Sequence, residues 1–138
     1  MIGKRAHELK IGASATFSKT ISETDIYLYA GITGDMNPAH INEVYAQGTF
    51  FERRIAHGML PAGFISNVLG TLLPGPGTIY MKQSLAFRAP VYIGDTITAK
   101  VEVVEVNVEK NRVRLNTTCT NQNGTLVLDG EALVSPPK

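Results

Sequence analysis

An acid and a base flank a short proline-containing segment, Gly34-Asp-Met-Asn-Pro-Ala-His40, in which Asp35 supplies a carboxylate and His40 an imidazole. Pro38 stiffens the backbone between them, because its ring fixes the φ angle. Two proton-transfer groups on a rigid loop can hold one water molecule between them. Asp, Asn and Pro also favour turns for purely local reasons. The segment is therefore either a plain turn or an acid/base site that deprotonates water and protonates a carbon, or the reverse.

A possible partner for this pair is the sequence His57-Gly-Met-Leu60, at the expected start of an apolar helix. The first backbone N–H groups of a helix have no internal acceptor and carry partial positive charge. Gly58 would let a ligand approach them closely, and so predicts a donor for a carbonyl oxygen that becomes negative during a reaction. Alternatively, Gly58 only permits tight packing. Ser66, about two turns further on, either positions a carbonyl or a water, or bonds back to its own helix.

Motifs for other chemistries are missing from the chain. There is no His-Glu-x-x-His, no Cys-x-x-Cys, no Gly-rich phosphate loop and no nucleophile elbow. A metal site formed by Asp35, His40 and His57 is conceivable, but the spacing of these residues is not one that is typical of metal ligands. The single cysteine, Cys119, lies in an expected strand, where a packed thiol is favoured over a nucleophile and no internal disulfide can form.

Length and composition limit the class of protein. With 138 residues, 43% hydrophobic and 18% charged, residues 1–138 are expected to form one globular domain. A net charge of +1 gives no argument for nucleic-acid binding. The longest apolar stretch is too short to span a membrane, and the N-terminus lacks the apolar core of a signal peptide. We therefore expect a cytoplasmic protein without nucleic-acid or membrane partners.

Helical periodicity dominates the first half of the chain. A strand at 17–20 is followed by a helix that Ser22 caps and that ends at 31–34, and Asn42 caps a second short helix. Residues 57–73 are apolar on almost every face. This segment predicts a helix that is buried nearly all round.

Strand patterns dominate the second half, at 78–88, 96–108, 112–121 and 125–134. Alternation over 96–103 indicates one dry and one wet face. Asn123-Gly124 predicts a hairpin with a two-residue loop. Because a helix that is apolar all round must be enclosed, the pattern predicts an α+β fold in which an antiparallel sheet curls around this central helix.

The residues from Tyr29 to His40, with Ala46 after them, resemble the signature segment of MaoC-like (R)-specific enoyl-CoA hydratases, and the resemblance continues through residues 55–60, 73–77 and 83–95. It therefore covers nearly the whole chain. Ala39 departs from the pattern, since the family usually has a branched aliphatic residue there, a change that concerns packing beside His40. The family has the hot-dog fold, in which a sheet wraps a central helix, similar to the shape that the pattern predicts.

The resemblance implies reversible hydration of a trans-2-enoyl-CoA to an (R)-3-hydroxyacyl-CoA, with water held between Asp35 and His40. It favours Asp35 as the base and His40 as the group that orients the water and assists proton delivery. The Gly58 amide would contact the thioester oxygen, with Ser66 near the reacting centre. No metal or redox cofactor is needed, because the thioester acidifies C2. Further substrate contacts are expected from Met36, Asn37, His57, Lys82 and Arg88, the last two as cations for the CoA phosphates.

A homodimer is also implied, and an unpaired sheet edge gives a physical reason for pairing. Three alternatives stay open: a 3-hydroxyacyl-carrier-protein dehydratase with the same catalytic pair, an acyl-CoA thioesterase, and a non-catalytic acyl-binding module. The presence of both Asp35 and His40 favours catalysis over binding alone. Their spacing resembles hydratases rather than hydrolases. Whether the product feeds polyhydroxyalkanoate synthesis or another branch of fatty acid metabolism stays open.

Overall fold

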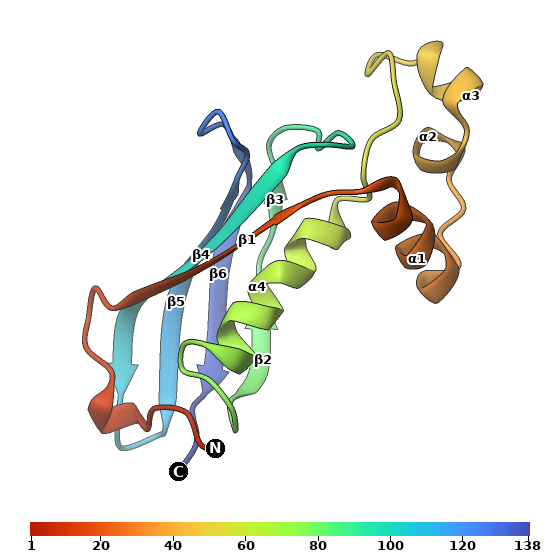
Figure 1. Cartoon of the computed structure of the whole chain (residues 1–138). Coiled ribbons are helices and arrows are strands. Elements are labelled where there is room, and N and C mark those ends of the chain that lie inside the picture. Colours follow the sequence, from red (N-terminus) through yellow and green to blue (C-terminus); the bar gives the residue numbers. More distant parts are fainter.

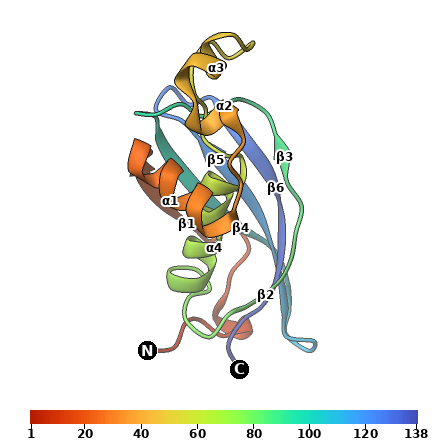
Figure 2. The ribbon, with the colours of Figure 1, turned by 90° about the vertical axis from the view of Figure 1, so that its right-hand side faces the viewer.

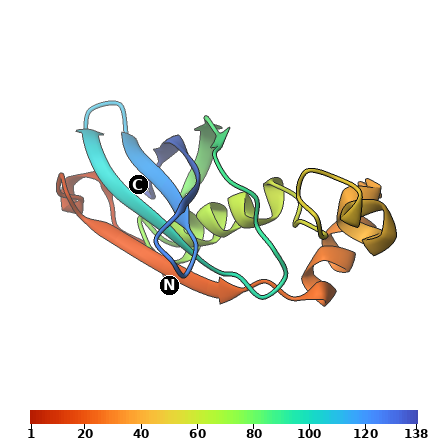
Figure 3. The same cartoon turned by 90° about the horizontal axis from the view of Figure 1, so that it is seen from above.

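One antiparallel sheet of six strands forms the body of the protein in the computed structural model, which describes residues 1–138 (Figure 1). The strands follow the order β1–β4–β5–β6–β2, and β3 pairs with β6. The sheet curls around α4 (Met59–Thr71), as the sequence predicts (Figures 1 and 3). The strands are β1 (Ser14–Thr20), β2 (Ile79–Gln83), β3 (Ala86–Phe87), β4 (Thr96–Asn107), β5 (Arg112–Thr120) and β6 (Leu126–Ser135).

The dry face of the sheet is built by alternation along its central strands. In β4, Ile97, Ala99, Val101 and Val103 are all fully buried, whereas Lys100 between them is exposed. A strand turns successive side chains to opposite faces, so these four apolar side chains point together toward α4. The predicted alternation is confirmed, and it places the core between the sheet and this helix.

The helix α4 is buried on one face only. Pro61 lies in its first turn, where the missing N–H costs nothing. The opposite face is open, with Met59 51% exposed and Gly63 and Ser66 exposed along the same face. The prediction of burial all round is wrong for a single chain, because the sheet covers the helix from one side. The buried residues of α4 are Leu60, Pro61, Ala62, Ile65, Val68 and Leu69.

Three short helices gather beyond the N-terminal end of α4: α1 (Glu23–Thr33), α2 (Pro38–Ile41) and α3 (Glu43–Gln47) (Figures 1 and 2). Ser22 caps α1 as predicted, since its hydroxyl accepts from the Asp25 N–H and the Asp25 carboxylate accepts from the Ser22 N–H. Gly34 ends α1 in the left-handed conformation, with φ of 79°. A 3₁₀ turn (Ala6–Glu8) precedes β1.

The helix α2 differs from the expected loop. The Asn37 side chain accepts from the Ala39 N–H, and Pro38 occupies the first helical position, so the segment begins a helix. Asp35 therefore stays in a loop, while His40 lies on a helical turn. No helix in the structure combines the length and the apolar character that a membrane crossing requires.

Two strand boundaries also differ from the sequence pattern. The expected strand at 78–88 is broken into β2 and β3. The hairpin between β5 and β6 is in the predicted place, but its loop consists of Gln122, Asn123 and Gly124, because the Asn121 N–H donates to the Thr125 carbonyl. Gly124 takes the left-handed conformation, with φ of 75°, after the turn rather than inside a two-residue loop.

Candidate functional site

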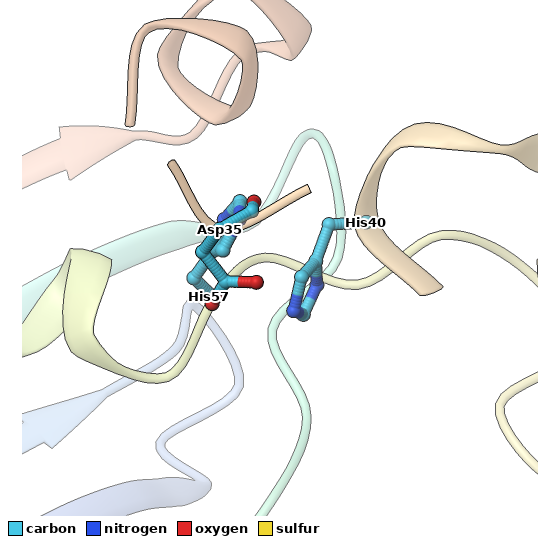
Figure 4. Close-up of side chains that lie close together, drawn as sticks. All are labelled: Asp35, His40 and His57. Atoms are coloured by element: carbon cyan, nitrogen blue, oxygen red, sulfur yellow. The ribbon is translucent and has the colours of Figure 1, made fainter. Parts of the chain in front are cut away.

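Asp35 and His40 lie close together beside the N-terminal end of α4, with His57 next to them (Figure 4). Asp35 comes from the loop after α1, His40 from α2, and His57 from the residues just before α4. Ligating atoms of the three side chains lie within 4.8 Å of one another, and His40 and His57 are buried whereas Asp35 is exposed. One water with hydrogen bonds of about 2.8 Å to each side can bridge a carboxylate and an imidazole at such a separation.

The hydrogen bond of His40 decides which ring nitrogen is basic. Its Nδ1 lies 2.7 Å from the Ile55 carbonyl oxygen. A carbonyl can only accept, so Nδ1 carries the hydrogen and Nε2 of the neutral ring keeps a lone pair. Burial lowers the pKa of His40 below its usual value of 6.5; the bond to Ile55 and the nearby Asp35 oppose this shift, and His57 adds to it. The site therefore favours a neutral His40 whose Nε2 lone pair is free to accept a proton.

The backbone around Ile55 is held from two sides. Its N–H donates to the Ala39 carbonyl over 3.2 Å, so the acceptor for His40 is tied to the helix that carries His40. Ile55 also forms an isolated antiparallel bridge with Tyr92. These contacts orient the carbonyl that sets the His40 tautomer.

The neighbouring Arg54 joins this segment to α1 and α3. Its guanidinium donates to Glu23 over 2.8 Å, to Glu43 over 2.9 Å and to the Tyr27 hydroxyl over 2.9 Å. The hydrogen bond from Arg54, followed by that from Tyr27, lowers the pKa of Glu23. The same contacts raise the pKa of Arg54 further above its usual range, with Glu23 making the largest contribution. Arg54 thus anchors the strip of backbone beside His40.

Gly58 lies at the first turn of α4, and its N–H donates to no acceptor within the protein. A Cβ added at Gly58 would lie 2.8 Å from a ring carbon of Phe87. A side chain at this position would thus press on the Phe87 ring, and its absence leaves the amide accessible. This arrangement agrees with the sequence-based expectation of an accessible donor.

A pocket of about 610 Å³ opens beside this donor. Both His40 and Gly58 lie on its wall, so the basic imidazole and the free amide face the same space. The remaining wall is mostly apolar and aromatic, which is typical of sites for small organic ligands. The other lining residues are Phe50, Phe51, Ile55, Ala56, Met59, Pro61, Phe87, Arg88, Ala89, Pro90, Val91, Val127 and Leu128.

The two cations predicted to contact phosphates are placed differently. Arg88 lines the pocket, and its Nε lies 3.0 Å from the Asp129 carboxylate. Lys82 is exposed on β2 and does not line this pocket. Only Arg88 is therefore within the pocket of a single chain.

The other predicted substrate contacts lie outside the pocket wall of a single chain. Met36 is exposed, and the Asn37 side chain caps α2. Ser66 lies on the exposed face of α4. His57 is only 2% exposed and packs behind His40, with ring centroids 3.9 Å apart.

The three clustered side chains do not fit a shared metal ion. A metal binds in the plane of an imidazole, along the lone pair of a ring nitrogen. The rings of His40 and His57 are stacked with a tilt of 33°, so their lone pairs do not converge on one point. In addition, His40 Nδ1 and His57 Nε2 are each bonded to a backbone carbonyl.

Two contributors to the site carry no sequence signal. The Ile55 carbonyl sets the His40 tautomer. Every residue has a backbone carbonyl, so residue type does not indicate which one bonds to the imidazole. Phe87 packs against Gly58 from a strand far along the chain. Neither contact can be read from spacing.

Comparisons with known proteins give one consistent result. Residues 7–124 match the family model described as MaoC like domain. The chain is 61% identical over 130 residues to the (R)-specific enoyl-CoA hydratase of Rhodospirillum rubrum, covering 94% of this chain and 90% of that protein. This relative shows that the overall sequence likeness extends well beyond the signature segment.

The structure is similar to two solved R-hydratases. The unliganded R-hydratase PhaJ1 from Pseudomonas aeruginosa matches with a TM-score of 0.93 and 45% identity, over 99% of this chain and 87% of that chain. The (R)-hydratase from Aeromonas caviae, described as involved in PHA biosynthesis, matches with a TM-score of 0.91 and 42% identity, over 94% of this chain and 98% of that chain. These matches confirm the predicted α+β hot-dog fold.

Proposed function

The chain belongs to the MaoC-like dehydratase family, and we propose that it is an (R)-specific enoyl-CoA hydratase. It adds water reversibly to a trans-2-enoyl-CoA and forms an (R)-3-hydroxyacyl-CoA. One observation carries the proposal: the Asp35 carboxylate and the imidazole of His40 lie close enough to share a water, and His40 lines the same pocket as the free N–H of Gly58.

In this proposal the thioester oxygen of the substrate accepts a hydrogen bond from the Gly58 N–H. This places C2 and C3 of the enoyl group toward His40, because both residues line the pocket. The thioester oxygen becomes negative as water adds, and a fixed N–H at a helix start stabilises that charge. Asp35 holds the water from the exposed side of the site.

The proton balance then follows from the His40 tautomer. Water adds its oxygen to C3 while one of its protons passes to His40 Nε2, and the electron pair of the double bond moves toward the thioester oxygen. His40 returns that proton from Nε2 to C2, so both new bonds form on one face of the substrate. Asp35 stays ionised and accepts a hydrogen bond from the second O–H of the water, whose hydrogen remains on oxygen as the 3-hydroxyl group of the product.

We favour His40 over Asp35 as the base, which departs from the assignment that the resemblance suggests. Burial lowers the pKa of His40, and its Nδ1 bond to Ile55 leaves Nε2 free to accept a proton. Asp35 is exposed, and its carboxylate accepts a hydrogen bond of 3.2 Å from the Asn37 N–H. This carboxylate is therefore held in place and accessible, which suits it to orient a water molecule.

The test follows loss of the conjugated enoyl-thioester absorbance of crotonyl-CoA, with an (R)-specific coupled assay for the product. We expect turnover by the wild type and a fall of about a hundredfold or more in Asp35→Asn and in His40→Ala. The control variant His7→Ala changes an exposed histidine far from the site in sequence and keeps its activity. Retained activity in both dyad variants would refute the mechanism.

The same assay separates the alternatives. A thioesterase would release free CoA thiol, whereas a hydratase consumes the double bond without releasing thiol. Binding of crotonyl-CoA without any reaction would favour an acyl-binding module. Turnover of a carrier-protein thioester alone would favour the dehydratase.

We also propose that two chains pair through the open face of α4 and the edge strand β2. The proposal rests on exposed apolar side chains there, including Met59, Ile79 and Met81, and on the unpaired outer edge of β2. A partner on this face would also cover Ser66. Light scattering should give twice the chain mass of 14.9 kDa, and a single-chain mass at micromolar concentration would contradict pairing. A cytoplasmic location stays a prediction.

A further inference from the structure

His57 is buried next to Asp35 and His40 (Figure 4), and it is not among the residues that line the pocket. Its ring lies between Tyr29, with centroids 4.6 Å apart, and His40, with centroids 3.9 Å apart. The residues on either side of it in the site, His40 and Gly58, both line the pocket, whereas His57 does not. A role in direct contact with substrate therefore has no support in this geometry.

What His57 does contact is the backbone of Asp35. Its Nε2 lies 3.0 Å from the Asp35 carbonyl oxygen, to which it donates. The other hydrogen bonds of residues 34–37 reach only residues 30–40: the four N–H groups donate to Ala30, Thr33, Gly34 and Asp35, and Asn37 accepts from the Ala39 and His40 N–H groups. The bond from His57 is thus the only hydrogen bond that joins this loop to a residue outside 30–40.

The second ring nitrogen of His57 supports a positional role. Nδ1 is buried and has no hydrogen-bond partner. A charged ring would place a second N–H there without an acceptor, so the contacts fit a neutral ring with its hydrogen on Nε2. A buried polar atom without a partner destabilises a fold, so the bond from Nε2 to Asp35 is the one hydrogen bond that this ring contributes.

We infer that His57 is a positioning residue, whose Nε2–H bond to the Asp35 carbonyl fixes the loop that presents the Asp35 carboxylate to the water held by His40. The stack of the two imidazoles sets the position of the His40 ring in the same way. Because His57 directly precedes Gly58, one residue links the carboxylate, the base and the amide donor. The inference deepens the proposed function and rests on it. The titratable groups that face this ring are Tyr29, Asp35 and His40.

Two substitutions separate the hydrogen bond from the ring. His57→Phe keeps a ring between Tyr29 and His40 but removes the donor, whereas His57→Gln keeps an N–H near the place of Nε2. With crotonyl-CoA we expect kcat of His57→Phe to fall about ten- to a hundredfold, as is typical when a reacting group is displaced by a fraction of an ångström to one ångström. Its KM should stay within about threefold, and His57→Gln should keep most of the wild-type kcat. The matched control, His7→Phe, makes the same change at an exposed site and should leave both constants unchanged.

A second readout does not depend on activity. Amide hydrogen exchange of residues 34–37 should speed up in His57→Phe and stay near the wild-type rate in His57→Gln and His7→Phe. Unchanged exchange and unchanged kcat in His57→Phe would overturn the inference, as would His57→Gln being impaired as strongly as His57→Phe. If the wild type fails to hydrate crotonyl-CoA, the proposed function fails, and the exchange data still decide whether His57 holds the loop.

Discussion

Replacing Gly58 with alanine tests the amide donor. The backbone conformation at this position tolerates alanine, whereas the added methyl group would collide with the Phe87 ring in the pocket. Gly58 has helical angles, φ −56° and ψ −36°, which any residue adopts. The new Cβ would lie 2.8 and 2.9 Å from two Phe87 ring carbons, against about 3.5–4.0 Å for a normal carbon contact. The ring must therefore move by roughly 0.7 Å or more. Phe87 is 56% exposed, so it can move toward solvent.

The expected result is a large loss of rate with little loss of stability. Gly58 is the N-cap residue of α4, so alanine gains less there than the about 1 kcal/mol that it gains over glycine in a helix interior. The exposed Phe87 ring can instead relieve most of the strain by moving toward solvent. We therefore expect the melting temperature to change by less than about 4 °C. If the methyl group and the displaced ring keep the thioester oxygen from the Gly58 N–H, kcat falls by about 10²- to 10³-fold.

Crotonyl-CoA hydration and thermal unfolding are measured on the same samples. Gly31→Ala is the matched control, because Gly31 lies exposed on α1 and an added Cβ there meets nothing within 4 Å; it should keep kcat and gain some stability. Adding Phe87→Leu to Gly58→Ala makes room for the new methyl group. Recovery in the double variant would assign the loss to the displaced ring. Full activity of Gly58→Ala would refute the role of this amide.

The pH dependence of His40, the cation in the pocket and the buried thiol of Cys119 can each be tested. Burial lowers the pKa of His40 from 6.5, and neutral Nε2 is the proposed base, so kcat/KM should be maximal above pH 6.5 and fall only at lower pH. The contribution of His40 to the free energy of unfolding is likewise present above pH 6.5 and lost as pH falls, because the unfolded state then binds more protons than the folded state. Arg88 lines the pocket and Lys82 does not, so Arg88→Ala should raise KM for crotonyl-CoA several-fold but not for crotonyl-pantetheine, which lacks the CoA phosphates. Lys82→Ala should change neither, and equal effects of both variants would contradict this placement. Cys119 is fully buried, and burial raises its pKa to about 12, so thiol reagents should label it only as the protein unfolds; rapid labelling in native buffer would contradict that burial.

Several elements could be predicted from the sequence, because their causes lie within a few residues. Ser22 and Asp25 cap α1 through contacts inside one turn. Gly34 ends that helix where a left-handed residue is needed. In β4, the dry face follows from alternation alone, since a strand directs every second side chain to the same side.

Other features depend on parts of the chain that are distant in sequence. The open face of α4 could not be predicted, because an apolar helix has the same pattern whether its own sheet or another surface covers it. The short helix α2 was missed because Asn and Pro favour turns and helix starts alike. The role inferred here for His57 also depends on a carbonyl more than twenty positions away in sequence, in the loop after α1.

The chemical groups of the site could be named from residue types alone: the carboxylate of Asp35, the imidazole of His40 and the bare amide of Gly58. How these groups act depends on contacts that form only in the folded chain. The tautomer of His40 depends on the Ile55 carbonyl, and the shape of the pocket depends on Phe87. The physical reason is that residue type specifies which protons and lone pairs are available, whereas their direction and basicity depend on burial and on hydrogen-bond partners that folding brings together.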